Sequence, residues 1–324
     1  MAFSNCIKLL IELKTELKHI IFPYQTHSQK EYHIPLSYQL FGKDLFSAPI
    51  ILINHALTGN SNVSGEKGWW KKLIGEGQVI NTNQYTVLCF NIPGNGYDVF
   101  FIDECEDFTT SDIAHIFLKG LEILNITKLY AVIGGSLGGG IGWEMLVKNP
   151  QLSEIFIPIA CDFKTHDWLH AQCLVQKFLL SQNDEPLQKA RIHAMLCYRT
   201  PKSLNDRFQN KYNHKKQSLK SEDWLVYHGN ALNERFSLKS YKLMNHLLMN
   251  LNAEEDELGK IQARVHLISV DTDLFFPASE MRMCYEKLKE KKEDVFYHEI
   301  KSIHGHDAFL MEYEQLNNII KNIL

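Results

Sequence analysis

The chain has 324 residues, a length that allows two domains or one large α/β domain. Hydrophobic residues make up 45% of it and charged residues 22%, which is ordinary for a globular protein and excludes disorder as the main state. Its 34 Lys and Arg residues stand against 38 Asp and Glu residues, and the net charge of −4 argues against a nucleic-acid partner.

The N-terminal segment contains one short apolar run, residues 7–13, which Lys8 and Glu12 interrupt. This run is too short and too charged for a signal peptide or a membrane span. The cysteines are scattered and form no C-x-x-C pair, unlike those of a zinc site or a disulfide framework; they are Cys6, Cys89, Cys105, Cys161, Cys173, Cys197 and Cys284. We therefore expect free thiols in a cytoplasmic protein, with no metal site and no membrane association.

Several strand-like segments are almost continuously apolar, as parallel strands covered on both faces are. They are Ile50–Asn54, Tyr85–Phe90, Lys128–Ile133, Glu154–Ile159 and Val265–Val270. Helical patterns separate them, at Asp112–Leu124 and at Gly139–Lys148. This alternation predicts an α/β fold with a mostly parallel sheet and helices on both of its faces.

The alternation stops in the middle of the chain, where residues 163–251 have a helical pattern with long polar spacers. We interpret this block as a helical cap inserted into an α/β core, which residues 1–162 and 252–324 form. The tail returns to core-like patterns, with a helix at Ala278–Lys291, a strand at Val295–Glu299 and a closing helix at Ala308–Ile323.

A G-x-S-x-G motif runs from Gly134 to Gly138, between a predicted strand and a predicted helix. This context is that of a nucleophile elbow, in which a strained turn lifts the serine hydroxyl above the sheet. Ser136 is the predicted nucleophile, and the N–H of Leu137 is a predicted oxyanion donor. The alternative, a glycine-rich loop that binds a phosphate, has the wrong spacing and lacks the acidic residue about 20 positions on.

A serine nucleophile needs a general base and a carboxylate that orients this base. In hydrolases with this elbow, the three residues occur along the chain in the order Ser, Asp, His. Asp271 and Asp273 both follow the late strand, and Asp273 is favoured because it starts the loop four residues before a proline. His304 and His306 both lie in the loop before the last helix, and His306 is favoured because it is closer to that helix.

A second oxyanion donor is expected in the loop after the first predicted parallel strand, where the sequence reads HALTG. The backbone N–H of Leu57 is the candidate. His55, at the start of the same loop, is interpreted as a residue that organises the loop without a chemical role.

Seven segments together resemble the homoserine O-acetyltransferases of methionine biosynthesis, which are acyltransferases with an α/β-hydrolase fold. The resemblance extends from about residue 30 to the C-terminus. Its segments are NHALTGNSNV at 54–63, GWW at 68–70, VIGGSLGG at 132–139, IPIA at 157–160, ARIHAMLCYRTPKSLNDRF at 190–208, VDTDLFFP at 270–277 and GHDAFLMEY at 305–313.

The resemblance implies a ping-pong reaction. Ser136 would take an acetyl group from acetyl-CoA, with His306 as general base and Asp273 orienting it, and would pass the group to the hydroxyl of L-homoserine. Acetyl-CoA would be a co-substrate, and no cofactor would be bound permanently. The partners would be these small molecules and a second copy of the chain, which would form a homodimer through the cap.

Two further residues and one loop concern the choice of acceptor. Asp307 matches the family position that contacts the amino group of the substrate. Lys177 stands where the family has an arginine for the substrate carboxylate, and lysine lacks the bidentate guanidinium. The loop at 91–99 also departs from the family pattern. Another acceptor or donor (L-serine, succinyl-CoA), a hydrolase with the same triad, and a silent scaffold are therefore alternatives.

Overall fold

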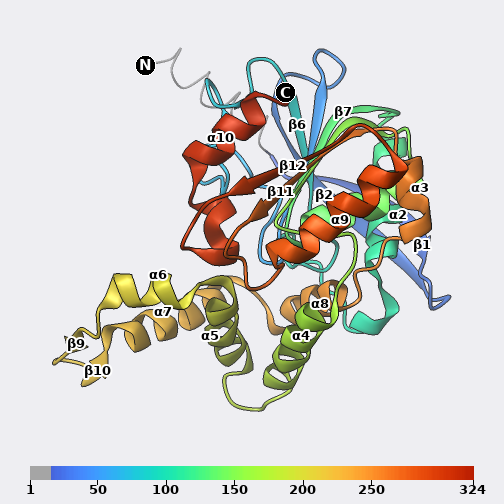
Figure 1. The fold of residues 1–324 in the computed structure, drawn as a ribbon. Coiled ribbons are helices and arrows are strands. Elements are labelled where there is room, and N and C mark those ends of the chain that lie inside the picture. Colours follow the sequence, from blue (N-terminus) through green and yellow to red (C-terminus); the bar gives the residue numbers. More distant parts are fainter. Residues whose placement is uncertain (1–15) are drawn as a thin grey trace, which may run out of the picture.

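The computed structural model describes residues 16–324. Cys6 and the apolar run at 7–13 lie outside the described residues. The other six cysteines are free thiols, and all but Cys105 are buried. No helix in residues 16–324 combines the length and the apolar character that crossing a membrane requires. Figure 1 shows one large sheet with helices on both faces and a second group of helices at one end of the sheet.

The sheet has eight strands in the order β1-β2-β6-β3-β7-β8-β11-β12. Neighbours from β6 to β12 are parallel, whereas β2 pairs antiparallel with both β1 and β6. The prediction of a mostly parallel sheet is therefore confirmed. The strands are β1 Lys18–Gln25, β2 Glu31–Gly42, β3 Ile50–Asn54, β6 Thr86–Phe90, β7 Leu129–Gly135, β8 Ser153–Ile159, β11 Arg264–Val270 and β12 Val295–Ile300.

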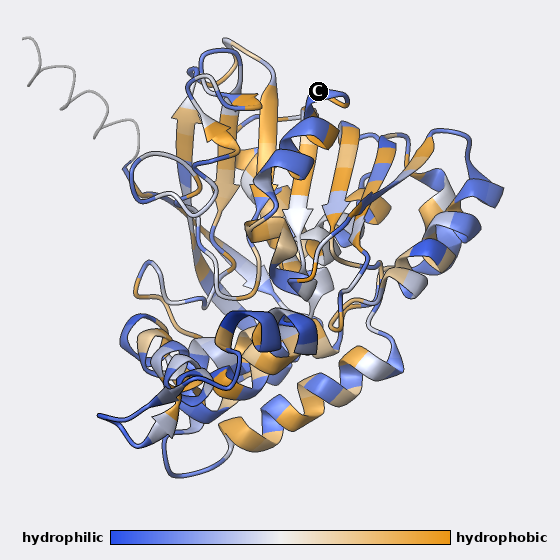
Figure 2. Cartoon of the chain, turned by 60° about the vertical axis from the view of Figure 1, so that its left-hand side comes forward, coloured by the Kyte–Doolittle hydropathy of each residue, from blue (hydrophilic) through white to orange (hydrophobic). Residues whose placement is uncertain are grey.

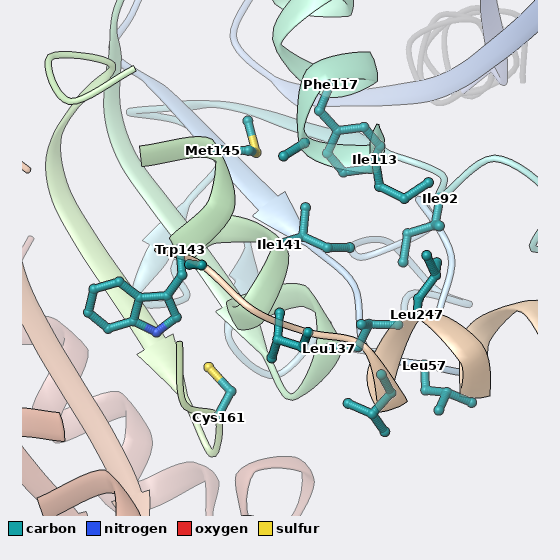
Figure 3. Close-up of a cluster of buried hydrophobic side chains, with 14 of the residues drawn as sticks. Leu57, Ile92, Ile113, Phe117, Leu137, Ile141, Trp143, Met145, Cys161 and Leu247 are labelled. Carbon is teal, nitrogen blue, oxygen red and sulfur yellow. The ribbon is translucent and has the colours of Figure 1, made fainter. Parts of the chain in front are cut away.

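The central strands are apolar because helices and loops cover the sheet on both faces. Every residue of β3 and β6 is buried. One face packs against α2 (Thr110–Ile123), α3 (Leu137–Lys148) and α9 (Ala278–Lys291). Figure 3 shows part of that core, where Ile113 and Phe117 of α2 lie near Ile141 of α3. Figure 2 shows that the strands of the sheet are mostly hydrophobic and that the helices around them are partly hydrophilic.

The opposite face of the sheet packs against α10 (Tyr313–Lys321) and against the segment around Trp70. The predicted closing helix at Ala308–Ile323 is wrong at its start. Residues Gly305–Leu310 form a 3-10 helix, η3, and the N–H groups of Met311 and Glu312 both bond to the carbonyl of Ala308. This tight turn separates η3 from α10, and hydrophobic periodicity alone does not reveal it.

Between β8 and β11 the chain forms five helices that lie together at one end of the sheet (Figure 1). They are α4 Asp167–Leu180, α5 Pro186–Tyr198, α6 Pro201–Phe208, α7 Lys220–Arg235 and α8 Leu238–Met249. A bridge between Lys164 and Asn252 joins the chain where it enters and leaves this helical block. The division into core and cap stays a prediction.

The remaining elements are short. Two strand pairs are formed by β4 (Ile74–Gly75) with β5 (Ile80–Asn81) and by β9 (Tyr212–Asn213) with β10 (Ser218–Leu219). Two further 3-10 helices are η1 (Cys105–Asp107) and η2 (Glu255–Lys260).

Candidate active site

Ser136 is the residue between β7 and α3, and its backbone is strained. Its φ of 54° and ψ of −128° lie in a region that residues with a side chain rarely adopt. The N–H of Ser136 donates to the carbonyl of Ile159 at 2.9 Å, which ties the turn to β8. The turn presents the hydroxyl at the N-terminus of α3, where the helix dipole favours negative charge.

The glycines two residues before and after Ser136 let the backbone segments pass each other. A Cβ at Gly134 would lie 2.4 Å from the carbonyl oxygen of Gly138, and a Cβ at Gly138 would lie 2.2 Å from that of Asn54. Because both contacts are with backbone, neither can relax cheaply. The motif therefore needs glycine at both positions.

The structure brings Ser136, Asp273 and His306 together. The Ser136 hydroxyl lies 2.9 Å from His306 Nε2, and Asp273 Oδ2 lies 2.7 Å from His306 Nδ1. All three residues are at most 4% exposed. Asp273 Oδ1 also accepts the N–H groups of Phe275 and Phe276, at 2.7 and 2.9 Å. The carboxylate is thus held so that its second oxygen faces the imidazole.

Asp271 and His304, the two competing candidates, have other partners. Asp271 Oδ1 accepts the N–H of Ser302 at 3.0 Å, and His304 Nδ1 lies 2.9 Å from the hydroxyl of Ser203. Both side chains therefore hold the loop that carries His306. Asp273 and His306 are the two candidates whose side chains bond to each other and, through His306, to Ser136. Their catalytic roles stay predictions.

Four aromatic rings surround the His306 imidazole, with centroids between 5.1 and 5.8 Å away: those of Tyr198, Phe275, Phe276 and Phe309. They fix the ring orientation and keep water from it. Tyr198 comes from α5, and the sequence reasoning did not single it out as a site residue. The signal available in the sequence was that Tyr198 belongs to ARIHAMLCYRT, which is part of one of the segments that resemble the homoserine O-acetyltransferases.

The N–H groups of Leu57 and Leu137 are the predicted oxyanion donors. Leu137 opens α3 directly after Ser136, and the loop of Leu57 follows β3. Neither N–H donates to any acceptor within residues 16–324. Both side chains are buried in the same core, as Figure 3 shows, which anchors the two backbone segments. Their role as donors stays a prediction.

His55 organises the loop of Leu57, as interpreted from the sequence. The buried ring bonds through Nδ1 to the carbonyl of Ala56 at 2.8 Å, and the N–H of Ile92 donates to Nε2 at 3.0 Å. Because Nε2 accepts, the proton of the neutral ring is on Nδ1. Burial lowers the pKa of His55 to about 4, so the ring is uncharged at neutral pH.

We expect His55 to make the protein less stable in mild acid. Its pKa is lowered in the folded chain from 6.5 to about 4. Between these values the unfolded chain binds a proton that the folded chain does not, so stability falls as the pH falls. The expected loss between about pH 7 and about pH 5 is about 2 kcal/mol of unfolding free energy. His55→Gln should remove this part of the pH dependence in urea unfolding.

The matched control for this prediction is His170→Gln, because His170 is an exposed histidine on α4. It should keep the pH dependence of the parent protein. If His55→Gln loses as much stability between the two pH values as the parent does, the assignment to His55 is wrong.

Asp307 lies next to His306 at the start of η3, and Arg199 pairs with it. Arg199 Nε is 2.9 Å from Asp307 Oδ2, and both side chains are mostly buried. The contact with the arginine fixes the direction of the Asp307 carboxylate. A contact between Asp307 and a substrate amino group stays a prediction.

Lys177 lies apart from these residues, on an outward face of α4. It lines a small hollow together with Cys105, Glu106, Lys242 and His246, none of which contacts the triad. A role of Lys177 in binding a carboxylate stays a prediction.

The loop at 91–99 connects the site to the helical block. The N–H of Ile92 holds His55, and a Cβ at Gly94 would meet Leu243 of α8. Val99 has a φ of 65°, which is strained for a β-branched residue, and its side chain is exposed.

Within residues 16–324 no group of three or more His, Cys, Asp or Glu side chains is arranged to hold a metal ion.

Comparison with known proteins gives matches over most of the chain. A family described as alpha/beta hydrolase fold matches residues 49–153. The homoserine O-acetyltransferase of Cyclobacterium marinum is 30% identical over 304 residues, which cover 84% of each chain. The solved homoserine O-acetyltransferase of Bacillus anthracis has a TM-score of 0.84 at 19% identity, covering 95% of this chain and 97% of that one. Esterase E22 also has a TM-score of 0.84 at 19% identity, covering 95% and 99%.

Proposed function

Because the chain belongs to the homoserine O-acetyltransferase family and has the α/β-hydrolase fold, we propose that it transfers an acetyl group from acetyl-CoA to the hydroxyl of L-homoserine. This reaction is a step of methionine biosynthesis and belongs in the cytoplasm. The observation that carries the proposal is the pair of hydrogen bonds at the nucleophile elbow, one between Ser136 and His306 and one between His306 and Asp273. Acetyl-CoA is a co-substrate, and the reaction needs no permanently bound cofactor and no metal.

In the first half-reaction, His306 Nε2 accepts the proton of the Ser136 hydroxyl while the oxygen attacks the thioester carbonyl. The N–H groups of Leu57 and Leu137 stabilise the oxyanion, and Asp273 stabilises the imidazolium. The carbon–sulfur bond then breaks, His306 protonates the leaving thiolate, and CoA departs. Ser136 is left as an acetyl ester.

In the second half-reaction, the acceptor hydroxyl gives its proton to His306 and attacks the acetyl ester. A second oxyanion forms and collapses, the proton returns to Ser136, and the O-acetyl product leaves. At this stage, transfer of the acetyl group to the acceptor must be faster than hydrolysis of the acetyl ester by water. The burial of the triad and the aromatic rings around His306 support transfer, because they restrict the access of water.

A hydrolase is the second candidate function, because esterase E22 shares the fold at the same TM-score as the transferase structure. The same triad would then pass the acyl group to water. The fold does not separate these two reactions, since both use an acyl-serine.

The deciding experiment gives the protein acetyl-CoA with L-homoserine, with L-serine or with no amino acid, and measures CoA release and product mass. We expect fast release only with L-homoserine, together with a product heavier by one acetyl group. A parallel series with succinyl-CoA tests the donor. Equally fast release without an amino acid would overturn the transferase proposal and favour the hydrolase.

We also propose that the protein is a homodimer that buries an apolar stripe on α4. Trp168 and Phe178 on that helix are 50% and 60% exposed, and Leu174 and Val175 lie exposed between them. Such a run of large apolar side chains is typical of an interface. Phe178→Glu would place a charge in this interface, and we expect light scattering to give half the molar mass of the parent protein.

Phe46→Glu is the matched control for the dimer, since Phe46 is equally exposed but lies outside the helical block. This variant should stay dimeric. A monomeric parent protein, or a Phe178→Glu variant that stays dimeric, would contradict an interface on α4.

A further inference from the structure

A small hollow lies where η1 meets the helices α4 and α8, apart from the catalytic triad. Its volume is about 180 Å³, and none of the triad residues lines it. The helix α8 packs against both η1 and α4 (Figure 1). A ligand in this hollow would therefore contact the segment that follows the loop at 91–99 and two helices of the helical block at once.

The positive charge of the hollow comes from two lysines, Lys177 of α4 and Lys242 of α8. Neither forms an ion pair or a hydrogen bond within residues 16–324. Lys239, one turn before Lys242 on the same helix, does pair with Asp103. Burial is the main reason why the pKa of His246, which also lines the hollow, is lowered, so its ring is uncharged at neutral pH. The two ammonium groups are thus available to an anion from outside the chain.

Asn245 of α8 supplies an acceptor to the same hollow. The residue is only 4% exposed, and its Nδ2 donates to the carbonyl of Cys173 at 3.0 Å. Because a carbonyl can only accept, this bond fixes which end of the amide is which. The Oδ1 atom accepts no hydrogen bond from the part of the chain that the structure describes. Polar groups in such mostly buried places normally have a partner, so this oxygen favours a donor from a ligand.

Glu106 of η1 is a second acceptor on the rim. The thiol of Cys105 donates to Glu106 Oε2 at 3.2 Å, and this bond is the largest cause of the lowered pKa of Glu106. The charge of Lys177 lowers the same pKa, which shows that the carboxylate and the ammonium group are near each other. Charges of both signs therefore line one small hollow.

We propose that this hollow binds a free α-amino acid with an unbranched apolar side chain. Lys177 and Lys242 bind its carboxylate, while Asn245 and Glu106 bind its ammonium group. The inference does not depend on the proposed function. It gives Lys177 a ligand that is distinct from the acetyl acceptor and that takes no part in the reaction.

The apolar wall of the hollow determines the kind of side chain. Leu180 is buried and Met249 is half-buried, and both line it. A methionine side chain adapts its shape to a neighbour, which suits a flexible unbranched chain. The volume of about 180 Å³ admits one small molecule. It is well below that of pockets for larger ligands such as CoA.

The test is titration calorimetry on the full chain with L-norleucine, an amino acid with a butyl side chain. We expect one molecule to bind per chain and to raise the midpoint of thermal unfolding, because it binds only the folded protein. Lys242→Gln should weaken binding about 10-fold or more, as the loss of a contact to a charged group does, and so should Lys177→Gln. Lys242→Gln should leave the release of CoA from acetyl-CoA unchanged. Lys239→Gln is the matched control and should bind as the parent does.

Two smaller probes test the two ends of the ligand. Hexanoate is norleucine without its ammonium group, and pentylamine is norleucine without its carboxylate. Each should bind about 10-fold more weakly or worse. No saturable binding of L-norleucine to the parent protein, or equal binding by Lys242→Gln, would overturn the site. Hexanoate that binds as tightly as L-norleucine would overturn the amino acid as the ligand. Displacement of L-norleucine by L-homoserine would place it at the acceptor site instead of the hollow.

Discussion

Replacing Ser136 by alanine is expected to lower kcat by about 10⁵-fold or more, the size of effect seen when a triad nucleophile is removed. Without the hydroxyl, no acyl-enzyme forms. The remaining oxyanion donors cannot compensate, because the attack on the thioester would depend on water alone. Steady-state release of CoA from acetyl-CoA in the presence of L-homoserine measures the loss.

We expect Ser136→Ala to fold as the parent protein does, so a loss of activity would reflect the loss of the nucleophile. The N–H of Ser136 keeps its bond to Ile159, and alanine meets the same strained φ as serine does. A fluorophosphonate probe should label the parent protein once and leave Ser136→Ala unlabelled. A parent protein that is folded but not labelled would favour the scaffold alternative, and a variant that keeps a tenth of the activity would exclude Ser136 as the nucleophile.

Asp273→Asn is expected to lower kcat by about 10⁴-fold, the effect typical of losing the acid of a serine triad. The carboxylate accepts from His306 Nδ1 at 2.7 Å and stabilises the imidazolium that forms in each half-reaction. An amide has no charge for this purpose, and its NH₂ group favours the wrong tautomer of the ring. The KM values should change little, because Asp273 is buried behind His306.

Asp271→Asn is the matched control, two residues away on the same loop. An asparagine there can still accept the N–H of Ser302, so we expect kcat within about threefold of the parent value. Equal losses in the two variants would mean that the loop, and not the carboxylate of Asp273, carries the effect.

The sequence by itself determined the class of fold and the position of the glycine-rich elbow that carries the predicted nucleophile, Ser136. The central strands are recognisable because parallel strands buried on both faces must be apolar along their whole length, and β3 was predicted with its observed bounds. The elbow is recognisable because its glycines are required by backbone contacts that span only a few residues. The edge strand β1 and its neighbour β2 were missed, since their partly exposed patterns are weaker signals.

Only the tertiary structure decided which residues meet. Ser136 and His306 are 170 residues apart, and no local pattern records their contact. The sequence favoured Asp273 over Asp271 only by its position in the loop, whereas their different hydrogen-bond partners appear only in the folded structure. Tyr198 reaches His306 from α5, a helix whose placement depends on packing at the end of the sheet. Contacts between distant segments depend on that packing, whereas the elbow depends on the chain around it.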